Sequence, residues 1–214
     1  MTTTWRMVVV IVSVLLMATS AWPQEKPRLG FKDIYLGMPR EDVKPIIEKG
    51  CKDSAETQKK WLRDNTPQTE DIIQETVRRN LTYCLKQGES ELRLPPTYSY
   101  VGSIFLGDVR VDLREDKVEA IYFDFKKKNY EALRAAFIEK YGPPTSRTSR
   151  TWQNKLGASF VGEMIIWHLR DGVITMNELS DRLDIGSALI ASEAYVDLLT
   201  REKKSRAKKD AEGL

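Results

Sequence analysis

A single histidine, His168, is the one side chain of this sequence that ordinarily exchanges protons near neutral pH. A serine–histidine–aspartate hydrolase needs such a histidine to accept the proton of its attacking serine. His168 follows Trp167 within a run that has the pattern of a strand, and no Gly-x-Ser-x-Gly sequence accompanies it. Reacting groups gather more often on loops. We therefore interpret His168 as an ordinary strand residue and assign no catalytic residue.

The two cysteines, Cys51 and Cys84, suit a different chemistry. They do not form a Cys-x-x-Cys pair, which argues against a thiol oxidoreductase. Outside the cytosol an isolated pair of cysteines is usually oxidised. A bond between them would close a loop of about thirty residues, which chain entropy converts into about 3–4 kcal/mol of stabilisation. The sequence therefore predicts a structural disulfide between Cys51 and Cys84.

Metal, nucleotide and carboxylate sites find little support in the residue types. One histidine and two half-cystines are too few ligands for zinc, and the acidic residues are interleaved with Lys and Arg. No phosphate-binding glycine motif occurs, so we expect neither a metal nor a cofactor. Glu119 and Asp124 lie five positions apart, on opposite faces of one strand, and cannot converge. A periplasmic hydrolase or other enzyme with an unrecognised carboxylate site is the alternative.

Aromatic side chains are the remaining candidates for a binding site. Tyrosine and tryptophan are enriched at the centres of protein interfaces, although they also complete cores. The candidates in or near the strand-like segments are Tyr98, Tyr100, Tyr122 and Trp152. The sequence offers them as an exposed sheet face that binds a partner, which we expect to be another envelope protein.

An apolar run near the start of the sequence indicates the cellular address. Arg6 precedes about a dozen apolar residues at 7–18, followed by small residues at 19–21 and by Pro23. This order is typical of a secretory signal peptide, here residues 1–21, and the run is shorter than the roughly 20 residues of a membrane span. No cysteine follows it for lipid attachment. We expect a periplasmic or secreted protein, with an N-terminal membrane anchor as the alternative.

Charge separates the body of the chain from its end. The sequence of 214 residues has 34 basic and 31 acidic residues, so the body has no electrostatic footprint for nucleic acid. Residues 201–214 are a basic helix end or tail, in which six cations face three acids. Weak contact with an anionic surface is one interpretation of this segment. A solvated helix end, whose cations suit the negative pole of the helix dipole, is the other.

The elements expected in the first half are short. A spacer at 22–30 precedes a strand at 31–36, and a helix begins at Pro39. Pro45 predicts a kink or a short helix, which Gly50 ends just before Cys51. A polar helical segment follows, and a second helix starts at residues 66–67 and reaches Cys84. The disulfide would clamp this helical excursion against the first helix.

Strand patterns dominate the second half. Apolar and polar residues alternate at 109–113 and 121–125 around a polar turn, and a helix capped by Asn129 follows. Residues 163–170 and 173–178 form a second hairpin around Asp171-Gly172, which predicts Trp167 opposite Met176 and His168 opposite Thr175. A last strand at 188–191 leads to a helix capped by Ser192.

Together these patterns predict one α+β domain, residues 31–200, whose antiparallel sheet is covered on one face by helices. Similar helix ends, Ile-Glu-Lys-Gly at 47–50 and Ile-Glu-Lys-Tyr-Gly at 138–142, leave open two degenerate helix-plus-sheet repeats. The expected core comprises Val43, Ile46, Val111, Ile121, Phe123, Leu133, Phe137, Trp167 and Ile174.

A resemblance rests on Gly-Met-Pro-Arg-Glu-Asp-Val at 37–43, Lys-Tyr-Gly-Pro-Pro at 140–144, Asn-Lys-Leu-Gly at 154–157 and Trp167 before a turn. With these features the chain resembles small, mostly uncharacterised exported bacterial proteins. Their arrangement is similar to the small lipoprotein subunit of the outer-membrane barrel-assembly machinery and to the β-lactamase-inhibitor fold. The resemblance spans residues 31–199 and implies a helix-covered antiparallel sheet and a place in the envelope. It supplies no catalytic residue, and this chain lacks the lipidation cysteine of that lipoprotein.

Overall fold

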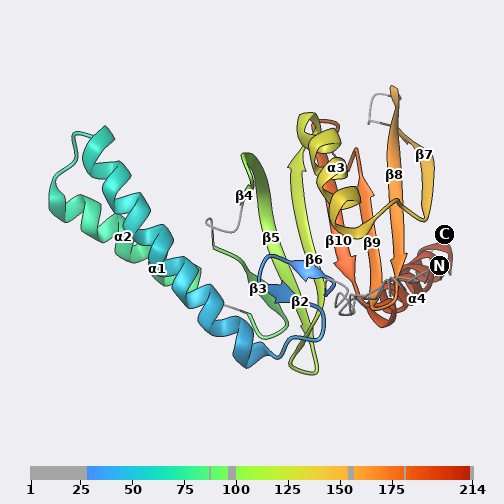
Figure 1. The fold of residues 1–214 in the computed structure, drawn as a ribbon, viewed down its shortest axis with the longest axis horizontal. Helices are drawn as coiled ribbons and strands as arrows, with labels where there is room; N and C mark the ends of the chain where they lie inside the picture. Colours follow the sequence, from blue (N-terminus) through green and yellow to red (C-terminus); the bar gives the residue numbers. More distant parts are fainter. Residues whose placement is uncertain (1–27, 87, 96–99, 154–156, 181, 213–214) are drawn as a thin grey trace, which may run out of the picture.

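An antiparallel sheet of eight strands organises the protein, as Figure 1 shows. The computed structural model describes residues 28–86, 88–95, 100–153, 157–180 and 182–212. The expected signal peptide, most of the spacer and Tyr98 lie outside these residues. The strand order is β3-β5-β6-β10-β9-β8-β7, and β4 pairs with β5. The strands are β3 (Glu91–Arg93), β4 (Tyr100–Val101), β5 (Ile104–Arg114), β6 (Lys117–Lys126), β7 (Ser146–Gln153), β8 (Ser159–Leu169), β9 (Gly172–Asn177) and β10 (Ile185–Ala191).

One face of this sheet carries the main core, which confirms the α+β prediction. Helix α3 (Tyr130–Tyr141), after a short 3-10 turn η2 (Lys127–Asn129), lies across the strands in Figure 1. Phe137 of α3 packs against Phe123 of β6 and Trp167 of β8, with ring centroids 6.3 and 6.0 Å apart. Every expected core residue is buried except Ile46, which is only partly buried, while its neighbour Ile47 is enclosed.

The chain enters this core through a small hairpin rather than through the expected single strand at 31–36. Strands β1 (Gly30–Phe31) and β2 (Ile34–Tyr35) pair antiparallel around a turn in which Lys32 has a φ of 52°. The turn places both Phe31 and Ile34 in the core. The apolar residues at 31–36 were expected to form one strand, but they belong to two short strands joined by a turn.

Helix α1 (Arg40–Asn65) is much longer than expected and runs without a break through Pro45 and Gly50. Tertiary contacts override the local breaking signals here. Val43 and Ile47 are buried in the main core, and the later turns pack against α2 (Glu70–Leu85). A helix of 26 residues spans about 39 Å at 1.5 Å per residue, so α1 extends well beyond the sheet.

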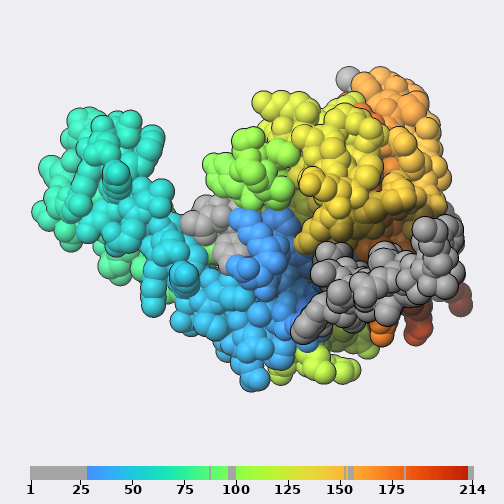
Figure 2. All heavy atoms as spheres, viewed as in Figure 1, coloured from blue at the N-terminus to red at the C-terminus, as the bar shows by residue number. Residues whose placement is uncertain are grey.

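The outer part of α1 and nearly all of α2, residues 52–83, form a helical arm that projects from the body (Figures 1 and 2). The arm has a small core of its own, formed by Ala55, Leu62, Ile73 and Val77. The predicted disulfide is present at its base, where Cys51 and Cys84 have Cα atoms 5.9 Å apart. The bond therefore closes the arm at the point where it leaves the main core.

Both expected hairpins are present, but the second has a different register. Val109 and Val111 pair with Phe123 and Ile121, as the alternation predicts. In the β8–β9 hairpin, however, Trp167 lies opposite Ile174 and His168 opposite Val173. Gly172 is the first residue of β9 instead of a turn residue. The turn is therefore Arg170-Asp171, and the shift of two residues leaves each side chain on its expected face.

The remaining elements complete the sheet and extend the chain end. Asn129 stands at the N-cap of α3 without a side-chain capping bond, and Gly142 ends that helix. Helices precede strands twice along the chain, α1–α2 before β3–β6 and α3 before β7–β10, and β6 joins the two groups by pairing with β10. The basic segment is helical as far as it is described, because α4 runs from Glu193 to Glu212. No helix within the described ranges has the length and apolar character needed to cross a membrane.

Candidate functional site

The second face of the sheet is the candidate site, and strand pairing defines its residues. Side chains alternate along each strand, so those next to the buried Ile121, Phe123 and Phe125 point to the opposite side. We call eight half-buried side chains on this side of the central strands the open face. They are Arg110, Tyr122, Asp124, Met164, Ile166, Thr175, Asn177 and Leu189.

The open face consists of two rows across the strands. The first row runs from Arg110 through Tyr122, Leu189 and Thr175 to Ile166, since each is the register partner of the next. The second row contains Asp124, Ser187, Asn177 and Met164, related in the same way. Five neighbouring strands span about 20 Å at about 4.8 Å per strand. The rows therefore join residues that lie far apart in the sequence into one surface.

One end of this side of the sheet is closed by the start of α4. Ala120, Ala191 and Val173 form the adjoining row and are buried. Ser192 caps α4 as predicted, because its Oγ accepts a hydrogen bond from the Tyr195 backbone N–H at 3.1 Å. The Tyr195 hydroxyl donates to Asp112 of β5, which ties the first turn of α4 to the sheet. The open face begins where this covered row ends.

Tyr122 is held firmly in the first row, between Arg110 and Leu189. Its hydroxyl donates to Asp124 Oδ1 at 2.5 Å, and the guanidinium of Arg110 lies 4.6 Å from its ring centroid. Burial and the neighbouring Asp124 carboxylate raise the pKa of Tyr122, so the phenol stays protonated at physiological pH. Tyr122 is thus an oriented aromatic ring whose one hydroxyl proton is engaged by Asp124, an arrangement that suits binding through the ring better than proton abstraction.

The other aromatic candidates lie toward the two edges of the sheet. Tyr100 of β4 contacts Phe105 of β5 edge-to-face, with ring centroids 5.4 Å apart, and both side chains are about half exposed, 49% and 52%. Phe105 precedes the buried Leu106 and therefore points to the same side as the open face. Trp152 belongs to β7 at the opposite edge, where its backbone pairs with Phe160. Tyr122 is the candidate that lies within the open face.

A charged cluster that the sequence analysis did not identify lies on the helix-covered face. Glu163 of β8 accepts a hydrogen bond from the Tyr130 hydroxyl at 2.6 Å and forms ion pairs with Arg147 at 2.6 Å and Arg134 at 3.2 Å. The sequence pattern could have indicated this cluster, because Glu163 shares the inward face of its strand with Ile165 and Trp167. An acid at such a position requires partners. The cluster joins α3 to β7 and β8 and leaves the Glu163 carboxylate satisfied, which favours a structural role.

Glu163 should give the protein a stability that depends on pH. Partial burial acts to raise the pKa of its carboxyl, but the bonds from Tyr130, Arg147 and Arg134 outweigh this and hold the pKa below its usual range. A carboxyl with a lowered pKa stabilises the fold above its unfolded pKa of about 4.3, and this contribution is lost as the pH falls through the folded value.

We therefore expect Glu163→Gln to cost roughly 1–2 kcal/mol of unfolding free energy at neutral pH, as lost charged hydrogen bonds do. The difference from wild type should shrink as the pH is lowered through the carboxyl range. Denaturant unfolding of both proteins at several pH values measures it. A difference that stays constant down to acidic pH would contradict the assignment. Glu131→Gln is a control, because that acid pairs with Arg134 from an exposed position.

His168 lies at the surface of β8 and is expected to be dispensable. Its side chain is exposed, and its backbone N–H donates to Thr145 Oγ1 at 2.9 Å, a bond that any residue would make. Replacement by Gln should change the unfolding free energy by less than about 1 kcal/mol and leave partner capture unchanged. Thermal unfolding and capture with His168→Gln check this. A well-folded variant that loses an activity would make His168 the first catalytic candidate.

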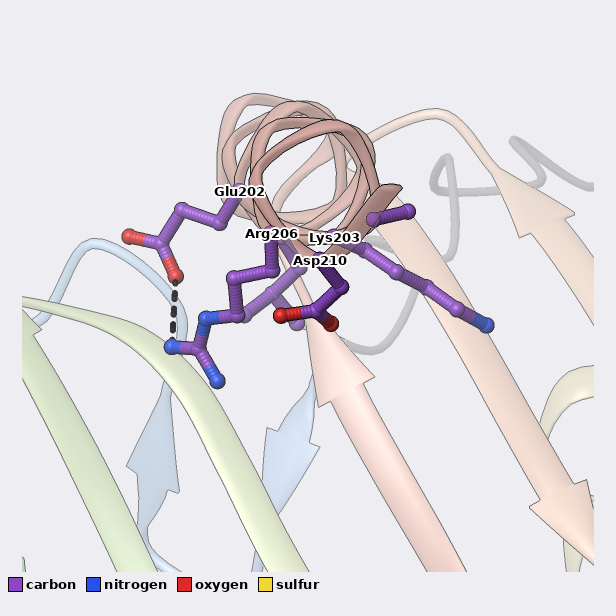
Figure 3. A pocket seen from close by; sticks show the side chains of 6 residues that line it. Glu202, Lys203, Arg206 and Asp210 are labelled. Atoms are coloured by element: carbon purple, nitrogen blue, oxygen red, sulfur yellow. Dashed lines mark ion pairs between the residues drawn. The ribbon is translucent and has the colours of Figure 1, made fainter. Parts of the chain in front are cut away.

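Two hollows of the described surface are lined by acidic side chains among basic ones. One, of about 370 Å³, lies along α4 and is lined by Leu199, Glu202, Lys203, Arg206, Ala207 and Asp210 (Figure 3). Glu202 and Asp210 are eight residues apart, about 12 Å along a helix, and Arg206 stands between them and pairs with Glu202 at 3.7 Å. Glycosidase-type carboxylates lie closer, at about 5–9.5 Å. Another hollow, of about 430 Å³, lies where α1 begins, and there Arg40 pairs with Asp116 at 2.7 Å.

In the part of the chain that the structure describes, no three His, Cys, Asp or Glu residues lie close enough together to hold a metal ion. Glu119 and Asp124 are engaged separately, by the hydroxyls of Ser192 and Tyr122.

Comparisons with protein-family models, curated proteins and solved structures found no match. The resemblance to small envelope proteins therefore stays a prediction, and a functional proposal must rest on the geometry of the chain.

Proposed function

We propose that the protein is a non-catalytic, exported envelope protein that binds another protein through its open face. The observation that carries this proposal is the first row of that face. Tyr122 is fixed between Arg110 and the aliphatic Leu189, and Ile166 extends the apolar surface onto β8. Aromatic and arginine side chains beside half-buried aliphatic ones are the composition of interface centres.

Two further observations support the proposed export and the proposed non-catalytic role. The Cys51–Cys84 disulfide is typical of proteins that leave the cytosol, and the apolar run at 7–18 has the pattern of an export signal. The charged clusters described above are engaged in ion pairs and hydrogen bonds that hold elements together. A binding role needs only the surface, whose side chains are already ordered by the sheet.

The test compares two substitutions on the same strand. Ile166→Arg places a charge on the open face, while Val161→Arg places it five residues away, on the other side of β8, where Val161 is 66% exposed. Tagged protein is returned to the native envelope, and bound proteins are captured and quantified. We expect a protein captured by wild type and by Val161→Arg to be reduced about tenfold or more with Ile166→Arg.

Tyr122→Ala gives an independent measurement if Ile166→Arg folds poorly. It removes the aromatic ring of the first row and should weaken binding of the same protein by about thirtyfold, the usual effect of losing a strong contact residue. Folding of each variant is checked by its thermal unfolding. Equal capture by well-folded wild type, Ile166→Arg and Tyr122→Ala would contradict the proposal.

A further inference from the structure

Strand β7 forms the longer of the two edges of the sheet (Figure 1). Within the described residues it pairs with β8 on one side and with no strand on the other. The pairing runs from Ser146 to Gln153 without a register shift, and β7 contains neither proline nor glycine. Residues 146–151 and Gln153 are exposed. Such an edge can template a further strand, and proteins commonly shorten, bend or interrupt it to prevent this.

The backbone groups of alternate β7 residues point away from the sheet. The carbonyl of Glu163 accepts the backbone N–H of Glu178 at 2.8 Å, so the backbone groups of Glu163 point to β9. Ser149 lies opposite Glu163 and therefore makes no backbone hydrogen bond to β8. The same holds two residues before and after Ser149. The N–H and C=O groups of Arg147, Ser149 and Thr151 thus point outward.

A second copy of β7 fits this edge in one register. Hydrogen-bonded pairing requires residues 147, 149, 151 and 153 of one copy to lie opposite members of the same set in the other. A two-fold register centred on Arg150 places this residue opposite its own copy, and like charges directly opposite are destabilising. The register centred on Ser149 places Arg147 opposite Thr151, and Arg150 opposite Thr148. The charge pattern therefore selects Ser149 as the centre.

The charge of Arg147 does not require an acidic partner strand. Its guanidinium forms an ion pair with Glu163 at 2.6 Å within the same chain. The other side chains at 146, 148, 149 and 151 are hydroxyls, and Ser and Thr pair favourably across antiparallel strands. Two-fold dimers are also by far the commonest oligomers. A second copy of this chain is therefore the occupant that the strand fits.

We infer that the protein forms a two-fold dimer in which the β7 strands of two copies pair antiparallel about Ser149, so that the sheet continues from one copy to the other. Ser149 pairs with its own copy at the centre, and Arg147 pairs with Thr151 on both sides of it. The interface is small, so the dimer depends on protein concentration. It uses the sheet edge and leaves the open face uncovered, so it is independent of the proposed binding function.

Sedimentation of the full chain measures the dimer. The protein is compared at concentrations from about 1 µM to about 1 mM, the affinities expected of a small interface. We expect the monomer to be replaced by a dimer as the concentration rises. A monomer at every concentration would overturn the proposal. Association through the apolar run at 7–18 does not need the backbone of β7, so the variants below distinguish it.

Ser149→Pro removes the outward N–H at the centre of the interface. It leaves the bonds between β7 and β8 in place, because proline is tolerated on an edge strand where the N–H faces solvent. We expect the dimer to weaken by about tenfold or more, since each copy loses a central backbone hydrogen bond. Ser149→Ala keeps the N–H and should dimerise like wild type. Thermal unfolding checks that both variants fold. Equal dimerisation of folded Ser149→Pro and wild type contradicts the pairing.

Cysteine cross-linking tests the register without the proline. Cys51 and Cys84 are the only cysteines of the sequence and are joined, so an introduced cysteine is the one free thiol. Ser149→Cys places two Cα atoms about 5.5 Å apart, within the range of a disulfide. Thr151→Cys lies about 14 Å from its copy, four residues along the strand. Mild oxidation should link Ser149→Cys about tenfold or more faster than Thr151→Cys. Equal rates would overturn the proposal.

Discussion

Removing the disulfide by Cys51→Ala with Cys84→Ala should lower the free energy of unfolding by about 4 kcal/mol, the chain-entropy value for a loop of this size. The two half-cystines are 33 positions apart, and Cys51 is buried in the main core. For a domain of this length the loss corresponds to roughly 8–16 °C in the unfolding temperature. The measurement is thermal and denaturant unfolding of the two proteins.

The loss should be concentrated in the helical arm. The arm has a small core, Ala55, Leu62, Ile73 and Val77, whereas the sheet keeps its own. Amide exchange should therefore accelerate in residues 52–83 while the central strands stay protected. Reduced wild-type protein is the control, since it breaks the same bond without a substitution. Thiol labelling of both cysteines in the unreduced folded protein, or an unchanged unfolding temperature, would refute this prediction.

Trp167→Ala should cost about 3–5 kcal/mol, the usual range for truncating a large buried aromatic residue. Trp167 has no exposed surface, packs against Phe137 at 6.0 Å between ring centroids, and lies opposite Ile174 on β9. Its indole N–H also donates to the carbonyl of Gly142 at 2.9 Å, the residue that ends α3. The side chain therefore fixes α3 to the sheet in two ways.

Trp167→Phe separates the two contributions. It keeps an aromatic ring in the core but removes the indole N–H, so it should cost roughly 1–3 kcal/mol for the unpaired carbonyl and the lost volume. Denaturant unfolding of the three proteins gives the values. If Trp167→Ala changed the unfolding free energy by less than about 1 kcal/mol, the core described here would be incorrect.

The sequence predicts elements well where a single physical demand governs the residues. The alternation around Ile121 and Phe123 reflects only the burial of one face, and the hairpin forms as expected. Gly172, in contrast, is needed for a reason other than the hairpin turn in which we placed it. A Cβ atom there would stand 2.3 Å from the carbonyl oxygen of Ala191, and its φ is 149°. This glycine permits a close approach between strands, which imitates a turn signal in the sequence.

Tertiary contacts explain most of what the sequence did not reveal. Pro45 and Gly50 predict breaks in α1, but the burial of Val43, Ile47 and Cys51 in the main core keeps the helix continuous there. Strand β7 was missed because it is an edge strand rich in Ser, Thr and Arg, which gives no apolar alternation. Tyr122 could be selected by residue type, but its neighbours Leu189 and Ile166 become apparent only when strand order is known.

The unbroken path of α1 makes the arm a mechanical lever. Val43 and Ile47 hold one end of this rod in the core, and its other end carries Leu62 about 20 Å beyond them. Because the rod has no hinge at the disulfide, a force on the arm tip turns the buried end as well. A displacement of the tip would thus strain the packing of Val43 and Ile47 beside the sheet.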